Sequence, residues 1–287
     1  MSKAEKNKKV VKGKLLLSYI ERDSPIHRLT GTTKLIGLLL WSISSMYTYD
    51  TRVLVVMMFM SFAILKISKI KFKEISFVFY LAMIFLILNN IGIYLFSPEH
   101  GTTLYGTRTE LAHLFWRYTI TSEQLFYQLN ITMKYFVVIP VALLFIVTTN
   151  PSEFASSLAG VGVSYKIGYS VSLALRYIPD IQRDFMNISK SQQARGIDLS
   201  RNEKTITRLK NVSAILLPLV MSSLARIDVI SNAMELRSFG KNPKRSWYIM
   251  KPFSRGDFIA LTFIVTVSIL AFVITFQNET RFFNPFI

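Results

Sequence analysis

Two arginines in the second half of the sequence offer its most distinctive chemistry. Arg195 and Arg237 are 42 residues apart and share their context, because an Ile-Ser pair begins seven residues before each of them. A guanidinium group presents a planar fork of donors that binds carboxylates or helix-end carbonyls through charge-assisted hydrogen bonds. Each arginine is therefore a candidate contact with a partner surface.

The apolar residues that precede each arginine are spaced for one face of a helix. In the first segment they recur at steps of three and four: Ile167, Val171, Ala174, Ile178, Ile181, Phe185 and Ile188. In the second segment the row is Leu209, Val212, Leu216, Leu219, Ser223, Ile227, Ile230 and Met234. Helical spacing carries each row on to its arginine, so both arginines are predicted to lie on the apolar side of their helices.

A purely structural role for the arginines is the alternative. A cation in the last turn complements the helix dipole, and Gly196 and Gly240 are typical residues after a helix end. The repeated context favours docking over capping. We expect a docking site in two parts, made of Ala194, Arg195, Gly196, Glu235, Arg237 and Ser238. We also expect a surface for helix packing or a partner, made of Ile178, Ile181, Phe185, Ile188, Leu216 and Leu219.

Long apolar runs predict that the chain is embedded in a membrane. The sequence is 51% hydrophobic and has no cysteine. Three runs, 75–96, 125–148 and 258–276, are long enough to cross a hydrocarbon layer about 30 Å thick. Two shorter runs, 35–49 and 53–65, are predicted to form a hairpin of two spans. Lys134 is the one charge within its run, and we expect it to snorkel toward the membrane interface.

The basic residues predict the orientation of these spans. The net charge is +17, and with a cytoplasmic N-terminus 29 of the 34 Lys and Arg residues fall in the cytoplasmic segments 1–34, 66–74 and 150–257. This distribution follows the positive-inside rule, and a single long helix over 35–65 would violate it. Contact with anionic headgroups accounts for the net charge, so no nucleic-acid partner is expected.

These patterns predict an all-α polytopic membrane protein with about five transmembrane helices and a cytoplasmic or interfacial module of long, kinked amphipathic helices. We expect a basic tail and lead-in at 1–34, four transmembrane helices at 35–149, coupling helices at 150–250, and the last transmembrane helix with an external tail at 251–287. Pro179 and Pro218 are expected to kink their helices. The polar segment 97–122 is expected to be an external loop.

Motifs for catalysis or cofactor binding are missing from the sequence. It has no Gly-x-x-x-x-Gly-Lys-[Ser/Thr] phosphate loop, no His-Glu-x-x-His and no Gly-x-Ser-x-Gly. Without cysteine there are no thiolate metal sites or disulfides, and His100 and His113 lack the spacing of metal ligands. We expect no catalytic residue, cofactor or metal site in this chain.

In four places the sequence resembles the transmembrane (T) component of energy-coupling factor (ECF) transporters, a family that includes the cobalt-transporter permease subunits. The most specific block is residues 172–179 (SLALRYIP) followed by Ala194-Arg195-Gly196. Residues 23–29 (DSPIHRL) with 33–35 (TKL) are similar to the family's N-terminal signature, and 148–153 (TTNPSE) to the start of its coupling region. Leu236-Arg237-Ser238 stands where the family has a second Ala-Arg-Gly-like motif, and Thr30-Gly31 where it has Asp-Pro.

The resemblance implies a scaffold in a bacterial plasma membrane. Such a T component joins two cytoplasmic ABC-type ATPase subunits to a substrate-binding membrane (S) subunit for a vitamin or a metal ion. It implies that Arg195 and Arg237 dock on the ATPases, while the apolar surface of the same helices carries the S subunit. The alternatives are a polytopic membrane enzyme or a stand-alone carrier that binds an anionic lipid or substrate through these arginines. Turnover by the single purified chain would identify the enzyme.

The predicted topology can be tested by single-cysteine labelling, because the natural chain has no cysteine. We expect a cysteine at Ser191 or at Asn232 to be protected from a membrane-impermeant thiol reagent in intact cells. The same cysteines should react once the membrane is opened. Labelling of either from outside intact cells would overturn the predicted orientation.

Overall fold

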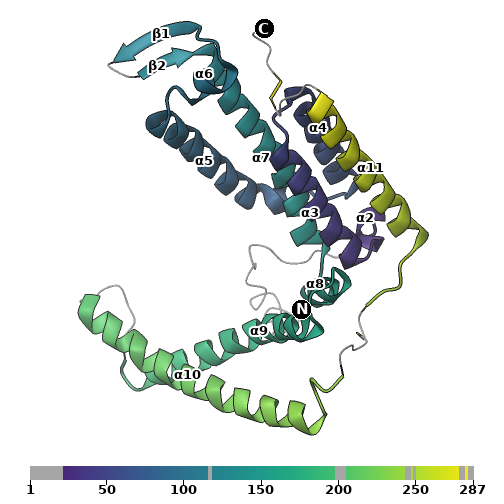
Figure 1. The fold of residues 1–287 in the computed structure, drawn as a ribbon. Helices are drawn as coiled ribbons and strands as arrows, with labels where there is room; N and C mark the ends of the chain where they lie inside the picture. Colours follow the sequence, from purple (N-terminus) through teal and green to yellow (C-terminus); the bar gives the residue numbers. More distant parts are fainter. Residues whose placement is uncertain are drawn as a thin grey trace, which may run out of the picture. The chain divides into compact units, whose positions relative to one another are not determined.

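The computed structural model describes residues 22–115, 118–197, 205–242, 247, 250–277 and 282–283. Its contacts divide the chain into two units, each described separately below. The bundle unit comprises Met1–Glu153 and Lys251–Ile287, and the helix-pair unit comprises Phe154–Met250. Figure 1 shows the helices of both units.

Five long helices form the bundle unit: α3 (Gly31–Tyr47), α4 (Thr51–Ile67), α5 (Phe72–Phe96), α7 (Ser122–Thr148) and α11 (Arg255–Gln277). The short α2 (Pro25–Arg28) precedes them, and the Ser24 side chain caps it by accepting from the backbone N–H of His27. The helices run in alternating directions, so the bundle has two ends. We call them the Asp257 end, where α3, α5 and α11 begin, and the hairpin end, where α4 and α7 begin.

A polar link joins three helices within the apolar core of the bundle. Trp41, Leu54, Met57 and Val137 are buried together. The Trp41 indole donates to Ser61 Oγ at 2.9 Å, and this oxygen also lies 2.9 Å from the Val137 carbonyl. The link joins α3, α4 and α7 and leaves the indole N–H satisfied, as burial away from water requires.

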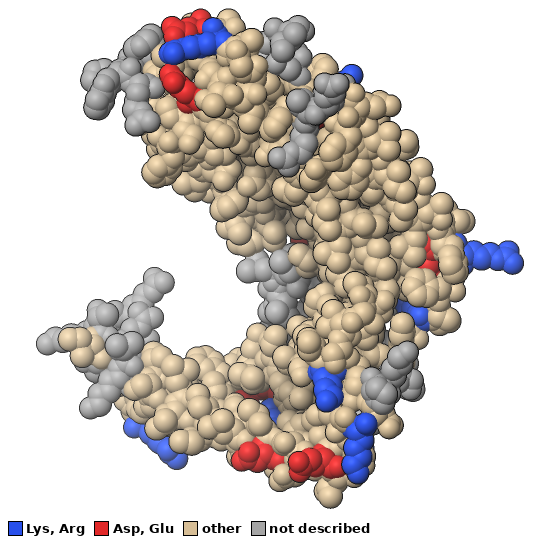
Figure 2. All heavy atoms as spheres, viewed as in Figure 1, with Lys and Arg blue, Asp and Glu red and all other residues tan. Residues whose placement is uncertain are grey.

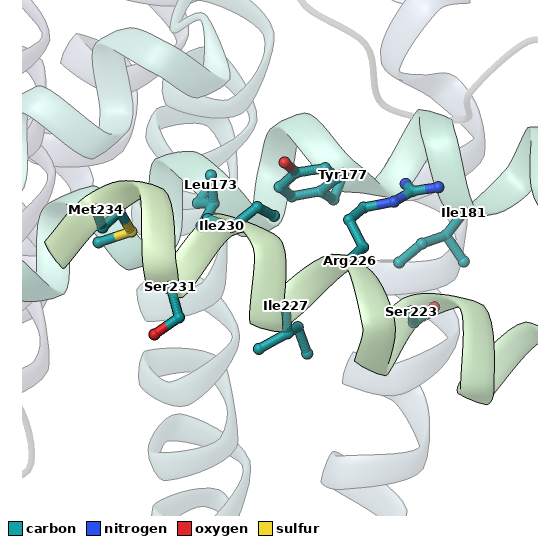
Figure 3. A pocket seen from close by; sticks show the side chains of 9 residues that line it. All are labelled: Leu173, Tyr177, Ile181, Ser223, Arg226, Ile227, Ile230, Ser231 and Met234. Atoms are coloured by element: carbon teal, nitrogen blue, oxygen red, sulfur yellow. The ribbon is translucent and has the colours of Figure 1, made fainter. Parts of the chain in front are cut away.

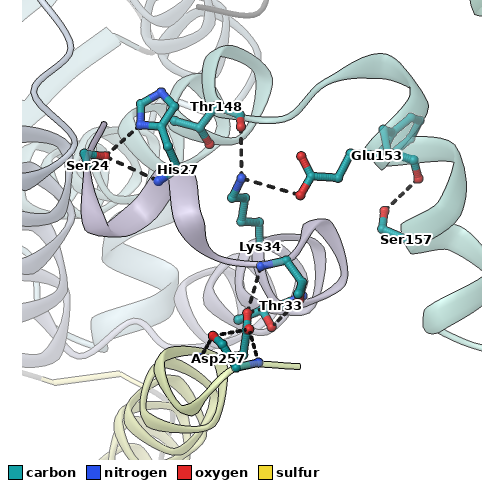
Figure 4. A network of polar contacts seen from close by, with 11 residues as sticks. Ser24, His27, Thr33, Lys34, Thr148, Glu153, Ser157 and Asp257 are labelled. Carbon is teal, nitrogen blue, oxygen red and sulfur yellow. Dashed lines mark hydrogen bonds and ion pairs between the residues drawn. The ribbon is translucent and has the colours of Figure 1, made fainter. Parts of the chain in front are cut away.

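The Asp257 carboxylate joins the first turns of two helices. One oxygen accepts from the backbone N–H of Thr30 at 2.8 Å and from its hydroxyl at 3.1 Å. The other accepts from the N–H of Ser254 at 2.8 Å and from its hydroxyl at 2.7 Å. Thr30 caps α3, and Ser254 pairs with Asp257 in the reciprocal pattern of a capping box at the start of α11. Figure 4 shows that these contacts converge on one fully buried carboxylate.

Two buried lysines donate hydrogen bonds to backbone carbonyls at the carboxyl ends of helices. At the Asp257 end, the Lys34 ammonium on α3 donates to the Thr148 carbonyl, the last of α7, at 2.9 Å and lies 3.9 Å from Glu153 (Figure 4). Toward the hairpin end, the Lys134 ammonium on α7 donates to the Met46 carbonyl in the last turn of α3 at 2.8 Å. Helices α3 and α7 therefore cap each other. The expectation that Lys134 snorkels is wrong, because its side chain is buried against Met46 and the Tyr49 ring.

Close packing favours glycine at the start of α3. A Cβ atom at Gly31 would lie 2.7 Å from the Glu153 side chain and 3.0 Å from its carbonyl oxygen. Glycine therefore fits where α8 begins beside the first turn of α3.

The polar segment 97–122 is more ordered than its composition predicted. It contains α6 (His100–Tyr105) and an antiparallel hairpin of β1 (Glu110–Phe115) and β2 (Tyr118–Thr121). The first turn of α7 holds this structure: Gln124 accepts from the Gly101 N–H at 2.7 Å, and the Glu123 carboxylate accepts from the Thr109 N–H at 3.0 and 3.1 Å. The hairpin is held by buried side chains of α7, and its own sequence lacks the regular alternation of apolar and polar residues that would have predicted strands.

The helix-pair unit is built from α9 (Tyr165–Ala194) and α10 (Thr205–Leu236), which follow α8 (Pro151–Gly160) along the chain. Both long helices continue without interruption through their prolines, Pro179 and Pro218.

Among the residues that the structure describes, four helices are long and apolar enough to cross a membrane by length and composition: α5, α7, α11 and the part Asn211–Leu236 of α10. The first three coincide with predicted spans. Helices α3 and α4, at 17 residues each, confirm the predicted helical hairpin and sit at the lower limit for a span. The α10 stretch differs from the expectation, because the helix extends well beyond the short apolar run 212–225. Figure 2 shows an uncharged surface along the bundle, with charged side chains gathered toward its ends.

Asp257→Asn tests the link between α3 and α11. The amide keeps the size of the carboxylate but turns a donor toward groups that are themselves donors, so we expect a loss of about 3 kcal/mol in the free energy of unfolding. Thermal or denaturant unfolding of the purified chain in detergent measures it. The control is Asp23→Asn, since Asp23 is 78% exposed in a surface ion pair with Arg28; we expect below about 0.5 kcal/mol there. Equal effects of the two substitutions would refute the structural role of Asp257.

Candidate functional site: two arginine-ended helices

Helices α9 and α10 pack against each other in opposite directions. Near the end of α9, the Gln192 amide donates to the Ala214 carbonyl in the first half of α10 at 3.3 Å. Near the start of α9, the Tyr169 ring lies 4.7 Å from the ring of Phe239, which follows α10. Residue numbers therefore rise along α9 as they fall along α10, and the carboxyl ends of the two helices point to opposite ends of the pair.

An ion pair marks the middle of this antiparallel arrangement. Arg226 on α10 lies 2.6 Å from the Asp184 carboxylate on α9, with about a third of each side chain exposed. Its guanidinium also lies 5.6 Å from the Tyr177 ring centroid. Asp184 and Arg226 are 42 residues apart, the same offset that relates Arg195 to Arg237. When two repeated helices pack in opposite directions, equivalent residues meet only at the midpoint of the pair. The 42-residue offset could therefore have predicted the contact between Asp184 and Arg226, and the sequence analysis did not use it.

A cavity of about 310 Å³ lies beside this ion pair, between the two helices. In Figure 3, Arg226 and Ile230 point from α10 toward α9, where Leu173, Tyr177 and Ile181 lie. The lining is apolar apart from the arginine and two serines. The helices thus touch along part of their length and leave apolar side chains uncovered elsewhere.

Helix α9 ends in a Schellman motif in which Arg195 is the C-cap residue. The N–H of Gly196 donates to the Gln193 carbonyl at 3.0 Å, and the N–H of Ile197 donates to the Gln192 carbonyl at 3.0 Å. Gly196 has φ 85°, the left-handed conformation that glycine adopts without strain. The motif satisfies two carbonyls of the last turn through the backbone, which leaves the exposed Arg195 side chain available for other partners.

Helix α10 ends in the same way, with Arg237 as the C-cap residue. The N–H of Ser238 donates to the Glu235 carbonyl at 2.9 Å, and the N–H of Phe239 donates to the Met234 carbonyl at 3.0 Å. Ser238 takes the left-handed position with φ 53°, the place that Gly196 has in α9. The sequence analysis treated Gly240 as the stop signal; the residue that ends the helix is Ser238, and Gly240 is a second turn residue with φ 92°.

The predicted docking residues are exposed at these two helix ends. They are Ala194, Arg195 and Gly196 on α9, and Glu235, Arg237 and Ser238 on α10. Arg195 and Arg237 each follow the Asp184–Arg226 pair by 11 residues in their own helices. At 1.5 Å per residue the backbone positions of the two arginines are separated by about 33 Å along the pair.

The predicted apolar surface divides into covered and uncovered parts. Ile178, Phe185 and Leu216 are exposed, by 46%, 41% and 45%. Ile188 and Leu219 are half-buried, and Ile181 lines the cavity although it is 39% exposed. On α10 the end of the predicted row coincides with the packed face. On α9 the row lies beside the packed face, because the contact with α10 runs through Leu173, Tyr177 and Asp184. In the described part of the chain no group of three or more His, Cys, Asp or Glu residues is placed to hold a metal ion.

Comparison with known proteins agrees with this architecture. The family model "CbiQ: Cobalt transport protein" matches residues 22–248. Three curated relatives are each named "Energy-coupling factor transporter transmembrane protein EcfT". The protein of Streptococcus equi subsp. equi is 28% identical over 90% of this chain and 96% of its own length. That of Limosilactobacillus fermentum is 26% identical over 89% and 95%, and that of Staphylococcus aureus 23% over 93% and 100%. The matched region includes most of the bundle and both arginine-ended helices, so the chain belongs to the CbiQ family and is a transmembrane T component of an ECF transporter.

Proposed function

We propose that this chain transmits the motions of two cytoplasmic ATPase subunits to a membrane subunit that binds the transported vitamin or metal ion. In this proposal Arg195 docks on one ATPase subunit and Arg237 on the other. The N-terminus and the helix-pair unit are cytoplasmic or lie at the inner membrane face. The ATP hydrolysis belongs to the partners, and this chain contributes the mechanical connection.

The observation that carries the proposal is the matched pair of helix ends. Each Schellman motif satisfies two carbonyls of its last turn through the backbone, and each guanidinium remains exposed. Because the helices are antiparallel, the two arginines lie on opposite sides of the Asp184–Arg226 pair at equal sequence distance. A rigid element with equivalent charged ends suits two related partners.

The uncovered apolar side chains of the helix pair support a second contact. Ile178, Phe185 and Leu216 are large and exposed. Their apolar area would be costly in water and favours burial against another apolar surface. We propose that these residues bind the substrate-binding membrane subunit, so that movement of the two arginine ends is passed to it.

Substitution of the arginines separates docking from capping. We expect Arg195→Ala and Arg237→Ala each to weaken binding of the ATPase subunits by about 1.5–3 kcal/mol, the value of a desolvated charge-assisted contact. The double substitution should uncouple or dissociate the complex. Lysine should rescue poorly because it keeps the charge and loses the planar fork. Pull-down of the ATPases and substrate-dependent ATPase activity measure these effects.

Lys190→Ala is the matched control, since Lys190 is an exposed cation on α9 that lies five residues before Arg195 and outside the Schellman motif. It should leave binding and coupling unchanged. Full rescue by Arg→Lys at both sites would favour a dipole-capping role, for which a loss of only about 0.3–1 kcal/mol is expected. Intact coupling in the double alanine variant would end the proposal.

Phe185→Asp tests the apolar contact. The substitution places a charge where the proposed partner surface is dry, so we expect the substrate-binding subunit to be lost from the purified complex, at a cost of several kcal/mol. Asn187→Asp adds the same charge at another exposed position of α9 and should be tolerated. Co-purification of the subunits measures the difference. If both variants assemble and transport normally, Phe185 does not face the partner.

A further inference from the structure

The turn between α7 and α8 leads the chain out of the bundle unit, and the first turn of α3 holds it at both ends. Before the turn, the Thr148 carbonyl accepts from the Lys34 ammonium at 2.9 Å. After the turn, the Glu153 carboxylate lies 3.9 Å from the same ammonium. Figure 4 shows Lys34 between these two groups. One buried side chain therefore contacts both ends of the turn 149–152.

The backbone of α3 supports the same contact. Gly31 lies three residues before Lys34 and thus on the same face of the helix. A Cβ atom at Gly31 would lie 2.7 Å from the Glu153 side chain, so the start of α8 rests directly on the α3 backbone. Lys34 is 7% exposed and Glu153 is 9% exposed. Their attraction is therefore screened by water less than that of a surface ion pair.

Further contacts extend from this turn in both directions. On the bundle side, the residue before α3, Thr30, donates to Asp257 through its N–H and its hydroxyl, and Asp257 lies in the first turn of α11. On the helix-pair side, a Cβ atom at Gly168 of α9 would lie 2.8 Å from the Ala155 carbonyl of α8. Ala155 follows Glu153 by two residues. Because closely packed groups transmit displacement, these contacts form a continuous mechanical connection from α9 to α11.

We propose that Lys34 is a positioning residue for energy coupling. It holds the start of α8 on α3, so that a movement of the helix pair is passed to α3 and α11. The inference rests on the proposed docking of the arginine ends on the ATPase subunits. The hydrogen bond to Thr148 is directional and fixes the ammonium to α7, whereas the longer ion pair tolerates small shifts of Glu153. The link can therefore follow α8 without breaking.

Lys134 provides a matched comparison inside the same bundle. It is also buried, and its ammonium donates to the Met46 carbonyl at 2.8 Å. It lies 14 residues before Thr148 on α7, which is about 21 Å along the helix from the α7–α8 turn. Loss of Lys134 therefore removes a buried helix cap of the same kind and leaves the link to α8 in place. If Lys34 were only a cap, the two lysines should behave alike.

Amide hydrogen exchange of the complete transporter, with and without an ATP analogue that is not hydrolysed, tests the connection. The N–H groups of Thr30 and Ser254 donate to Asp257 and serve as the α3–α11 reporters. The N–H groups of Gly196 and Ile197, in the Schellman motif of α9, serve as the α9 reporters. In the unsubstituted transporter we expect the analogue to change the exchange rate of both sets by about fivefold or more, the lower limit of typical coupling between sites.

Three variants separate coupling from stability. Lys34→Met should keep the response of the α9 reporters and abolish that of the α3–α11 reporters. Lys134→Met should lower the melting temperature by a similar amount, because it removes the same kind of buried hydrogen bond, but should keep both responses. Glu153→Gln retains the Lys34 cap on Thr148 and should weaken only the α3–α11 response. Combined with Lys34→Met it should add little, because the two residues act as one contact.

A purely structural role of Lys34 would alter exchange equally with and without the ATP analogue. The proposal is therefore wrong if Lys34→Met keeps the α3–α11 response, or reduces it no more than Lys134→Met does. It is also wrong if the unsubstituted transporter shows a response of the α9 reporters and none of the α3–α11 reporters. A lack of any response of the α9 reporters would instead contradict the docking proposal, and this inference with it.

Discussion

A carboxylate removed from water is costly unless its oxygens are hydrogen-bonded, and the bundle supplies those bonds to Asp257 from two helix starts. Thr30 and Ser254 donate to it through both backbone and hydroxyl groups. The first N–H groups of a helix have no partner within the helix, so the carboxylate satisfies donors that would otherwise be orphaned. It thereby fixes α11 beside α3, across 227 residues of sequence.

The same constraint explains the two buried lysines. Within a hydrocarbon layer the last carbonyls of a helix find no water, and each unsatisfied group is expensive. Lys34 and Lys134 meet this need for α7 and α3 respectively. A charge in a span is therefore not by itself a sign of transport chemistry here. In the helix pair, Schellman motifs satisfy two carbonyls at each carboxyl end through the backbone, and the arginine side chains stay exposed.

The elements with a strong periodic signal were predictable, and the contacts between distant residues were not. The long apolar runs and the 42-residue repeat gave three spans, the α3–α4 hairpin and the positions of Arg195 and Arg237. The β-hairpin was missed because buried groups on α7, such as Glu123, hold it in place. Lys134 was misread because its acceptor is on another helix. The exposed apolar residues of α9, such as Ile178 and Phe185, were predicted from their spacing. The face of α9 that packs on α10 was not predicted, because Asp184 contacts α10 through an ion pair rather than an apolar side chain.

The equivalence of the two arginine ends is close but incomplete, and the difference has a physical basis. Glycine holds the left-handed position after Arg195 at no steric cost, whereas Ser238 holds it after Arg237 at a cost of roughly 1 kcal/mol. Phe239 then packs on Tyr165 and Tyr169 of α9, which anchors the turn that the serine strains. The Arg237 end is thus tied to the start of the opposite helix by aromatic contacts. The Arg195 end is joined to α10 by the hydrogen bond from the Gln192 amide to the Ala214 carbonyl. The repeated motif is therefore supported by different contacts at its two ends, while the arginine at each end stays exposed.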